Sequence, residues 1–239
     1  MKKKNNILKR IVLIVAIVVI VSFASLLIYA SDYLRTEEAM YEQIDSLDTN
    51  EVTRYEDGDE ISFTVSNPEN NIVFIPGGKV EVHSYEYLAI SLAMAGNNVT
   101  ISKAFLNLAI FTPDYAKRFL EDDLNNIVIG HSLGGVVAAM LSSGNDKVSQ
   151  VILLGSYSTA DISDKDVLLI TAEFDLGLDL DKLEASFSKL PSDFERFNII
   201  GGNHAQFGWY GLQPGDGTAS ISTLEQQDLV ISRILEFIE

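Results

Sequence analysis

Hydrophobic residues follow three successive patterns along the chain. Residues 11–31 form an apolar run without a charged side chain. Residues 32–66 mix polar and apolar positions, and from Asn71 onward short apolar runs alternate with longer amphipathic stretches. Each pattern predicts a different kind of structure, because the spacing of apolar positions reports which side of an element is shielded from water.

The first run predicts a membrane-spanning helix. Its 21 residues, at about 1.5 Å rise per residue, cover roughly 30 Å, the thickness of a bilayer's hydrocarbon core. Basic residues that precede such a run stay on the cytoplasmic side. They are Lys2, Lys3, Lys4, Lys9 and Arg10. We therefore expect residues 1–30 to be a basic tip and a membrane anchor, with the remaining chain outside the cytoplasm.

A cleaved signal peptide is the alternative interpretation of this segment. Ala30, a small residue, precedes Ser31, as a cleavage site would require. However, the apolar run exceeds the roughly 7–15 residues of a signal peptide, and Ile28 stands where a small residue is preferred. The sequence favours an uncleaved anchor, and secretion after cleavage is the alternative.

The second pattern predicts a connecting segment and the start of a domain. Residues 31–50 are expected to be a stalk or short helix, since apolar positions are scattered among polar ones. The domain is expected over residues 51–239. It begins with two strands, residues 51–55 and 61–66, in an antiparallel hairpin around the turn signal Asp57-Gly58-Asp59.

The third pattern predicts an α/β fold with a mostly parallel sheet and helices on both faces. Short apolar runs stopped by glycine or proline are typical of strands buried on both sides. The expected strands are 71–75, 97–105, 126–130, 148–155, 166–175 and 194–202, and the expected helices are 85–95, 113–123, 133–143, 179–190 and 223–238.

Composition and charge restrict which binding partners and cofactors the chain can have. After the basic N-terminal residues are set aside, 12 basic and 34 acidic residues leave a net charge of −22. This charge repels phosphate backbones and argues against nucleic acid as a partner. The absence of cysteine removes disulfides, thiolate metal sites and a cysteine nucleophile. The three histidines lack metal-ligand spacing, so we expect neither metal nor cofactor.

Ser132 is the candidate nucleophile. It stands in Gly130-His131-Ser132-Leu133-Gly134, between a predicted buried strand and a predicted helix. The pattern Gly-x-Ser-x-Gly in this setting is typical of a sharp turn that presents the serine hydroxyl to a pocket. The turn also places the Leu133 N–H at a helix N-terminus, where it can stabilise an oxyanion. A simple helix cap is the alternative role for this serine.

A serine nucleophile needs a base, and the base needs an orienting acid. His204 follows the last predicted strand, at the edge of the sheet where Ser132 is expected. Asp175 ends the strand before it, which gives the chain order Ser, Asp, His that this architecture requires. Glu173 and Asp179 are alternative acids.

The remaining candidate residues belong to the oxyanion hole and the substrate pocket. The loop after the first parallel strand, Ile75-Pro-Gly-Gly-Lys-Val80, is expected to supply a second oxyanion donor at Gly78 or Lys79. Only residues 156–165 occupy the interval where a helical lid would be inserted, which predicts an open, shallow site for small or surface-presented esters. The candidate pocket residues are Lys79, His83, His131 and Phe207.

With the motif GHSLGG at 130–135, the chain resembles the α/β-hydrolase superfamily from residue 71 to residue 239. The segments PGGKVEVHSYEYLA and GGNHAQFGWYGLQPGDGTASIS resemble small bacterial hydrolases near the dienelactone-hydrolase-like group. This resemblance implies serine-hydrolase chemistry by Ser132, Asp175 and His204. Dienelactone hydrolases use a cysteine nucleophile where this chain has serine, so their substrate does not carry over.

These observations together predict a membrane-anchored, extracytoplasmic carboxylesterase that acts on a small-molecule ester through an acyl-enzyme. An acyltransferase or an amidase would use the same residues. A non-catalytic surface binding module with a hydrolase-like fold is the alternative from another class.

Overall fold

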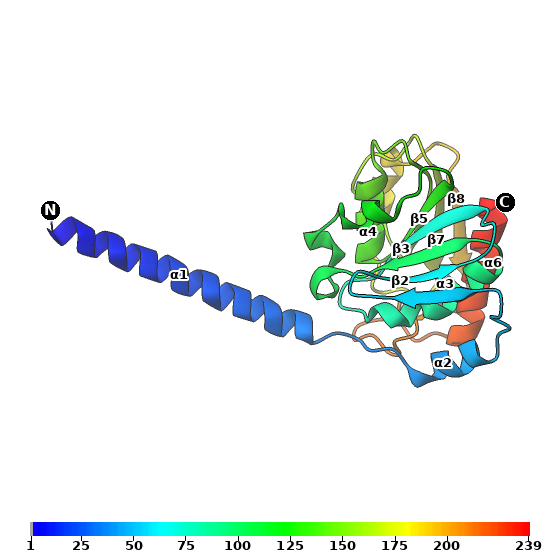
Figure 1. Ribbon diagram of the computed structural model, residues 1–239, viewed down its shortest axis with the longest axis horizontal. Helices are drawn as coiled ribbons and strands as arrows, with labels where there is room; N and C mark the ends of the chain where they lie inside the picture. The colour runs from blue at the N-terminus through cyan, green and yellow to red at the C-terminus, as the bar shows by residue number, and fades with distance from the viewer. Residues whose placement is uncertain (1) are drawn as a thin grey trace. The chain divides into compact units, whose positions relative to one another are not determined.

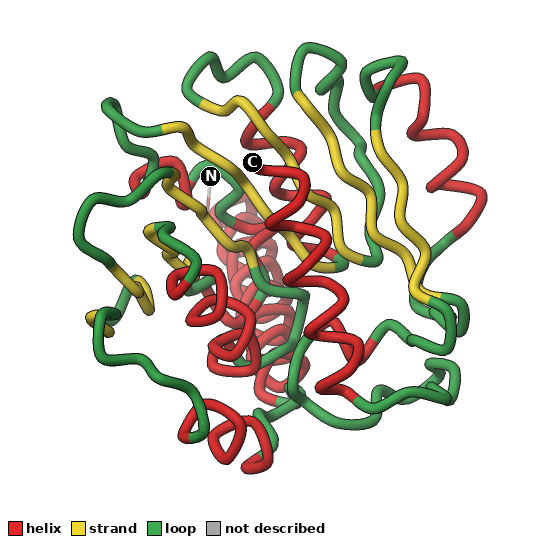
Figure 2. The backbone as a smooth tube through the Cα atoms, turned by 90° about the vertical axis from the view of Figure 1, so that its right-hand side faces the viewer, coloured by secondary structure: helices red, strands yellow, loops and turns green. Residues whose placement is uncertain are grey.

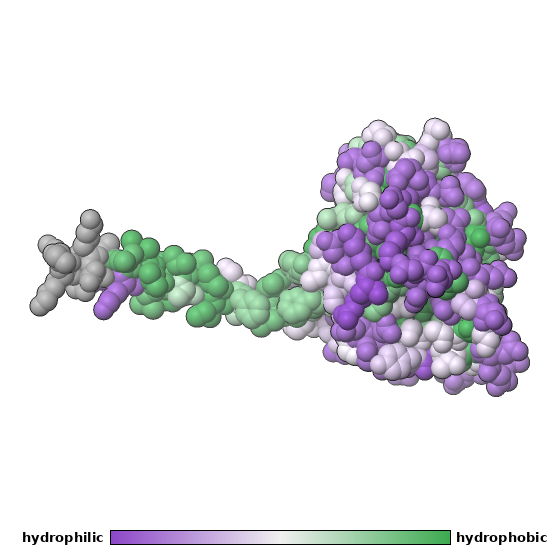
Figure 3. All heavy atoms as spheres, turned by 45° about the horizontal axis from the view of Figure 1, so that its top comes forward, coloured by the Kyte–Doolittle hydropathy of each residue, from purple (hydrophilic) through white to green (hydrophobic). Residues whose placement is uncertain are grey.

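The computed structural model describes residues 2–239, with side chains described from Leu8 onward, and the chain divides into two compact units. The first unit, Met1–Tyr33, contains the helix α1 (Lys2–Ser31). Within α1, Leu8–Ser31 is long and apolar enough to cross a membrane, with a mean hydropathy of 3.3, although a signal sequence has the same properties. Figure 3 shows hydrophobic side chains along this helix.

The second unit, Leu34–Glu239, is built on one eight-stranded sheet (Figure 1). The strand order is β1-β2-β4-β3-β5-β6-β7-β8. β1 and β2 form an antiparallel hairpin at one edge, β2 pairs antiparallel with β4, and the other neighbours are parallel. The strands are β1 (Thr53–Glu56), β2 (Glu60–Thr64), β3 (Asn70–Ile75), β4 (Asn98–Ser102), β5 (Asn125–His131), β6 (Val148–Leu154), β7 (Asp166–Ala172) and β8 (Glu195–Ile199). The predicted mostly parallel sheet is confirmed.

Helices cover both faces of the sheet (Figure 2). One core contains residues from α2 (Glu38–Asp45), α3 (Glu86–Met94) and α6 (Thr223–Ile238), and the other contains residues from α4 (Leu133–Ser142) and α5 (Leu180–Ser186). The side chains of β3 explain this two-sided burial. Ile72 and Phe74 pack into the first core, whereas Val73 and Ile75 pack into the second, because alternate strand residues face opposite sides.

The segment between β4 and β5 differs from its prediction. A strand was expected to residue 105 and a helix over 113–123, but β4 ends at Ser102 and only a 3-10 turn, Tyr115–Phe119, follows Pro113. Leu106 and Asn107 both have a φ of 55°, which ends the extended conformation. Within the turn Ala116 is the buried residue, so the segment lacks the apolar stripe that stabilises a longer helix.

The segment that leads into the domain packs on the compact unit. Met40 of α2 is fully buried in the first core. Leu34 pairs with the loop after β3: its N–H donates to Lys79 O at 2.8 Å, and it accepts from Glu81 N–H at 2.8 Å. Glu37 N–H donates to Trp209 O at 2.9 Å. Residues 34–50, expected as a stalk or short helix, therefore lie within the unit.

Candidate active site

Ser132 occupies a strained turn between β5 and α4. Its backbone angles, φ 52° and ψ −122°, lie in a region that costs a non-glycine residue about 1–3 kcal/mol. The Ser132 N–H donates to Leu154 O of the neighbouring strand at 2.9 Å, which holds the turn in register with the sheet. Such strain persists only where the surrounding packing imposes it, and here it places the serine at the start of α4.

Two glycines allow the start of α4 to approach the ends of β5 and β3 closely. A Cβ on Gly130 would lie 2.3 Å from Gly134 O, and a Cβ on Gly134 would lie 2.1 Å from Ile75 O. Neither distance is available to a side chain, so each position requires glycine. The flanking glycines of the motif therefore have a steric role, as expected for a nucleophile elbow.

His204 and Asp175 form a buried pair. His204 Nδ1 lies 2.9 Å from Asp175 Oδ2 and 2.8 Å from Asp175 Oδ1. The Leu178 N–H donates to Asp175 Oδ1 at 2.8 Å, which orients the carboxylate. The alternative acids are engaged elsewhere: Glu173 accepts from Gly201 N–H at 2.8 Å, and Asp179 caps α5. The structure thus brings His204 and Asp175 into direct contact.

A hollow of about 390 Å³ opens at Ser132. Gly155 and Gly177 line it and also lie against the acid–base pair, since a Cβ on Gly155 would be 2.8 Å from Asp175 Oδ2 and a Cβ on Gly177 would be 2.8 Å from His204 Cγ. The acid–base pair therefore packs behind two glycines that line the hollow at Ser132, and His204 itself is not among the lining residues. Its full lining is Ser132, Leu133, Val136, Gly155, Ser156, Tyr157, Gly177, Leu178, Asp179 and Lys182.

The loop after β3 lies beside the elbow. A Cβ on Gly78 would be 2.8 Å from Leu133 Cδ2, so the loop backbone approaches the start of α4. The Lys79 N–H is already used, because it donates to Asn107 O at 2.8 Å. The Gly78 N–H makes no hydrogen bond to the described residues. Of the two candidate donors in this loop, Gly78 is therefore the one with a free amide.

None of the four residues expected in the substrate pocket lines the hollow. His83 pairs with Glu86 at 2.6 Å and belongs to an ion-pair cluster near β1. Phe207 is fully buried, with its ring centroid 5.5 Å from that of His131. Lys79 lies in the loop after β3. These residues are close to site residues in sequence, but a pocket is formed by whichever loops converge in space, and here those loops follow β6 and β7.

His131 packs behind the candidate base. It is buried, and its ring centroid lies 4.7 Å from that of His204. Burial and the neighbouring His204 hold the pKa of His131 well below its usual value, so the ring is neutral. Its Nδ1 is 2.9 Å from the Tyr85 hydroxyl, which accepts from the Gly77 N–H at 3.0 Å. This chain of contacts links the turn before Ser132 to the loop that carries Gly78.

Comparison with known proteins identifies the family of the fold. Residues 71–228 match the alpha/beta hydrolase family. The chain belongs to this family. No curated protein gives a significant match in sequence.

Several solved structures share the α/β-hydrolase fold. A dienelactone hydrolase from Anabaena variabilis is 14% identical, with a TM-score of 0.58 over 78% of this chain and 98% of its own. A ferulic acid esterase from Streptomyces cinnamoneus is 17% identical, with a TM-score of 0.58 over 71% of this chain and 66% of its own. An esterase from Pyrococcus furiosus is 12% identical, with a TM-score of 0.56 over 80% of this chain and 92% of its own. At these identities the likeness concerns the fold.

Three further residues of this α/β hydrolase position the candidate site. Gly155 and Gly177 leave room for the His204 ring. The Asp216 carboxylate accepts from Leu176 N–H at 3.1 Å and from Ala205 N–H at 2.8 Å, so it joins the loops that carry Asp175 and His204. Gly155 could be suspected from the sequence because it ends a predicted strand. The hydrogen-bond partners of Asp216 could not be predicted, because they depend on how the loops fold.

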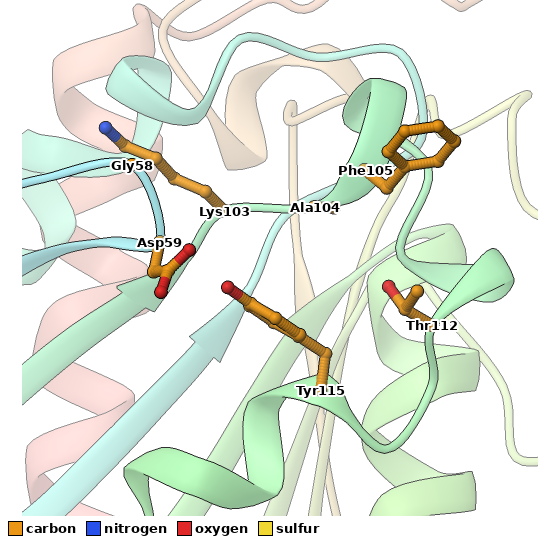
Figure 4. Close-up of a pocket in the computed structure, with 7 residues that line it drawn as sticks. All are labelled: Gly58, Asp59, Lys103, Ala104, Phe105, Thr112 and Tyr115. Carbon is orange, nitrogen blue, oxygen red and sulfur yellow. The ribbon is translucent and has the colours of Figure 1, made fainter.

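A second hollow, of about 370 Å³, lies at the other end of the same sheet edge (Figure 4). Its charged side chains have partners: Lys103 Nζ donates to Glu56 Oε1 at 2.8 Å, and Arg118 pairs with Asp59 at 3.1 Å. The hollow is lined by Gly58, Asp59, Lys103, Ala104, Phe105, Thr112 and Tyr115. Because the candidate nucleophile is not in its lining, the hollow at Ser132 is the candidate active site.

Proposed function

We propose that this α/β hydrolase is a serine hydrolase that cleaves carboxylic esters. Ser132 is the nucleophile, His204 the general base and Asp175 the acid that orients the imidazole. The contact that supports this assignment is the buried His204–Asp175 pair, which lies behind the two glycines that wall the hollow at Ser132.

In the proposed reaction, the His204 Nδ1–H donates a hydrogen bond to the Asp175 carboxylate, which stays ionised, so that the unprotonated Nε2 accepts the Ser132 hydroxyl proton. The serine oxygen attacks the ester carbonyl, and the Leu133 and Gly78 N–H groups stabilise the oxyanion. The protonated His204 then donates its proton to the departing alkoxide. A water molecule repeats the sequence on the acyl-enzyme and releases the acid.

The hollow indicates the size of the acyl group. A volume of about 390 Å³ is near the lower end of the range for ligand pockets. Leu133, Val136 and Leu178 give it apolar walls, while Lys182 at its border is neutralised by Asp179 at 2.9 Å. A short, uncharged acyl chain is therefore the best fit.

We further propose that the hydrolase is anchored in the cell membrane with its catalytic unit outside the cytoplasm. The apolar helix Leu8–Ser31 and the basic residues before it support this location. Signal-peptide cleavage at the end of this helix is the alternative, and the size of the mature protein separates the two.

The test is covalent labelling of the full-length protein in detergent with a fluorophosphonate, together with p-nitrophenyl ester hydrolysis. We expect labelling and turnover in the wild type and in the control Ser188→Ala, and loss of both in Ser132→Ala. Acetate and butyrate esters should be preferred over palmitate. Labelling that persists in Ser132→Ala would refute the assignment, and a wild type without labelling or turnover would support a non-catalytic module.

A further inference from the structure

Exposed apolar side chains of the second unit are concentrated at one edge of the sheet. Among the side chains described from residue 34 onward, seven large apolar ones are at least half exposed, and one of them, Tyr55, lies in β1. The other six lie on segments that follow the carboxyl ends of parallel strands, with exposed fractions from 50% for Phe111 to 87% for Leu212. We call these six the apolar rim: Phe105, Phe111, Leu176, Leu180, Ile200 and Leu212.

The rim flanks the candidate active site on both sides. Phe105 and Phe111 follow β4, in the loop whose Asn107 O accepts from the Lys79 N–H beside Gly78. Leu176 directly follows Asp175, and Leu180 begins α5 beside the hollow. In the sheet order, β4 lies to one side of β5, while β7 and β8 lie to the other. The hollow at Ser132 thus opens between the two groups of rim residues.

Several exposed apolar side chains around one site are unusual for a surface that contacts only water. Single exposed apolar side chains are ordinary, but several around one site mark a surface that contacts something apolar. Removing a Leu or Phe side chain from water is favourable in proportion to the apolar area covered, so even partial coverage of several rim residues would stabilise binding. The net charge of −22 outside the N-terminal segment disfavours an acidic partner.

The path of the chain indicates which apolar partner covers the rim. Leu34, the first residue of the second unit, is bonded to Lys79 and Glu81 in the loop after β3, at the same sheet edge as the rim. Only Asp32 and Tyr33 separate Leu34 from the end of the helix that is long enough to cross a membrane. The polypeptide therefore enters the unit at the edge that carries both the rim and the hollow.

We propose that the apolar rim docks on the surface of an uncharged lipid bilayer, and that the site acts on esters presented in that surface. The proposal rests on the proposed function and adds its substrate class: a short-chain ester carried by a lipid or another membrane-embedded alcohol. Rim residues enter the headgroup region, and the scissile carbonyl reaches Ser132 from the bilayer instead of from water.

The activity test uses the full-length protein in phosphatidylcholine vesicles and two butyrate esters, water-soluble p-nitrophenyl butyrate and a butyrate ester of a long-chain alcohol embedded in the vesicles. In the triple variant Phe105→Ser, Phe111→Ser and Leu212→Ser, hydrolysis of the embedded ester should fall about tenfold or more, which corresponds to about 1.4 kcal/mol. Hydrolysis of the soluble ester should stay within about twofold of the wild type, because these side chains do not line the hollow.

The matched control places the same change away from the rim. Met94→Ser, Met140→Ser and Leu229→Ser alter three exposed apolar residues of α3, α4 and α6. This triple variant should cleave both esters as the wild type does. Equal loss in the two triple variants, or no loss in the rim variant, would overturn the proposal. A wild-type dimer in detergent that becomes monomeric in the rim variant would instead show an interface between copies of the chain, and would also overturn it.

A second measurement is independent of catalysis, so it separates failure of the docking from failure of the proposed function. The chain has no cysteine, which allows a single polarity-sensitive fluorophore to be attached at Leu212→Cys or, as a control, at Met94→Cys. In vesicles that contain a lipid-borne quencher, we expect quenching at position 212 and none at position 94, also in the Ser132→Ala background. Equal quenching at the two positions would overturn the docking even if the esterase is active.

Discussion

At the scale of single residues, Gly155 determines where the acid–base pair can lie. It follows β6, has a φ of 50°, and leaves no space for a side chain, since its Cβ would be 3.0 Å from His204 Nδ1. The position carries no reactive group, yet it controls the geometry of two residues that do. Small displacements of a base are costly, because a shift of about 1 Å can lower a rate by about 10²-fold.

Gly155→Ala is therefore expected to lower kcat for p-nitrophenyl butyrate by about 10²-fold, with little change in KM. Gly144→Ala is the matched control, because Gly144 has a φ of 62° but open space around its Cβ position. Both variants incur the same kind of backbone cost, and only Gly155→Ala displaces the pair. Equal activities in steady-state kinetics would contradict this role of Gly155.

The sequence suggests candidate residues whose chemistry is recognisable, but not the residues that act by shape. The catalytic roles of Ser132 and His204 stay predictions, and these two residues were found because a glycine-flanked serine and a histidine after the last strand are recognisable patterns. The pocket lining could not, because Tyr157 and Leu178 enter the hollow only through the paths of the loops after β6 and β7. His131 was expected in the pocket, but its side chain points into the core behind His204.

At the scale of elements, one carboxylate joins two loops. Asp216 accepts from the residue after Asp175 and from the residue after His204, and its Oδ1 also accepts from Gly217 N–H at 2.8 Å. Both loops leave neighbouring strands, β7 and β8, so the carboxylate fixes their separation. The candidate acid and base are thereby held in place by a group outside the pair.

Asp216→Asn should lower kcat/KM by about tenfold while fluorophosphonate labelling of Ser132 persists at a reduced rate. Asparagine retains one acceptor oxygen and loses the other, so one of the two loops is released. Asp193→Asn, an exposed aspartate in the loop before β8, is the control and should match the wild type. Unchanged kinetics in Asp216→Asn would show that the loops hold their positions without this carboxylate.

A second link between elements depends on pH. The hydrogen bond to Glu86 raises the pKa of His83, against an opposing effect of burial. Burial raises the pKa of Glu86, but the hydrogen bonds from His83 and Arg54 outweigh it and lower the net value. These contacts join β1 to the start of α3.

Because the pKa of His83 is higher in the folded state than its usual value of 6.5, protonated His83 stabilises the folded state. This contribution is complete at pH values below 6.5, and it is lost as the pH rises through the pKa of the folded state. His83→Gln should therefore lower the free energy of unfolding by about 1 kcal/mol at pH 6 and by much less at pH 9. Urea denaturation at the two pH values measures this difference. A loss that is the same at both pH values would indicate a packing role.

The helices and strands that are most deeply buried were the easiest to predict from the sequence. Strands β3, β5, β6 and β7 are apolar on both sides, so their apolar runs were conspicuous in the sequence, and α6 matches its predicted bounds. The segment between β4 and β5 was not predicted correctly, because its 3-10 turns have too few buried positions to produce a periodic pattern.

At the scale of the whole molecule, both apolar cores consist of residues from Leu34 onward. The fragment Leu34–Glu239 is therefore expected to fold, to remain in the supernatant after ultracentrifugation and to hydrolyse p-nitrophenyl butyrate with the kcat/KM of the full chain. The full chain should sediment with membranes. A fragment that aggregates, or that loses activity on the soluble ester, would show that the N-terminal unit contributes to the fold.

The fold class could be predicted from the sequence because alternating buried strands and helices permit few arrangements. The start of the compact unit was harder to predict. Apolar positions between residues 34 and 50 are too sparse to distinguish a helix that packs on a domain from a free connecting segment. The structure shows Met40 buried against the same core as α3.

The short stretch from Leu34 to Glu37 bonds to the loop after β3 at one end and to Trp209, beyond the histidine loop, at the other. If the proposed location outside the cytoplasm is correct, a protease that cuts before Leu34 would release the second unit with these hydrogen bonds intact. A cut a few residues further along would remove the hydrogen bonds that join the loop after β3 to the segment after His204, so the position of the cut decides how much of the fold the released fragment keeps.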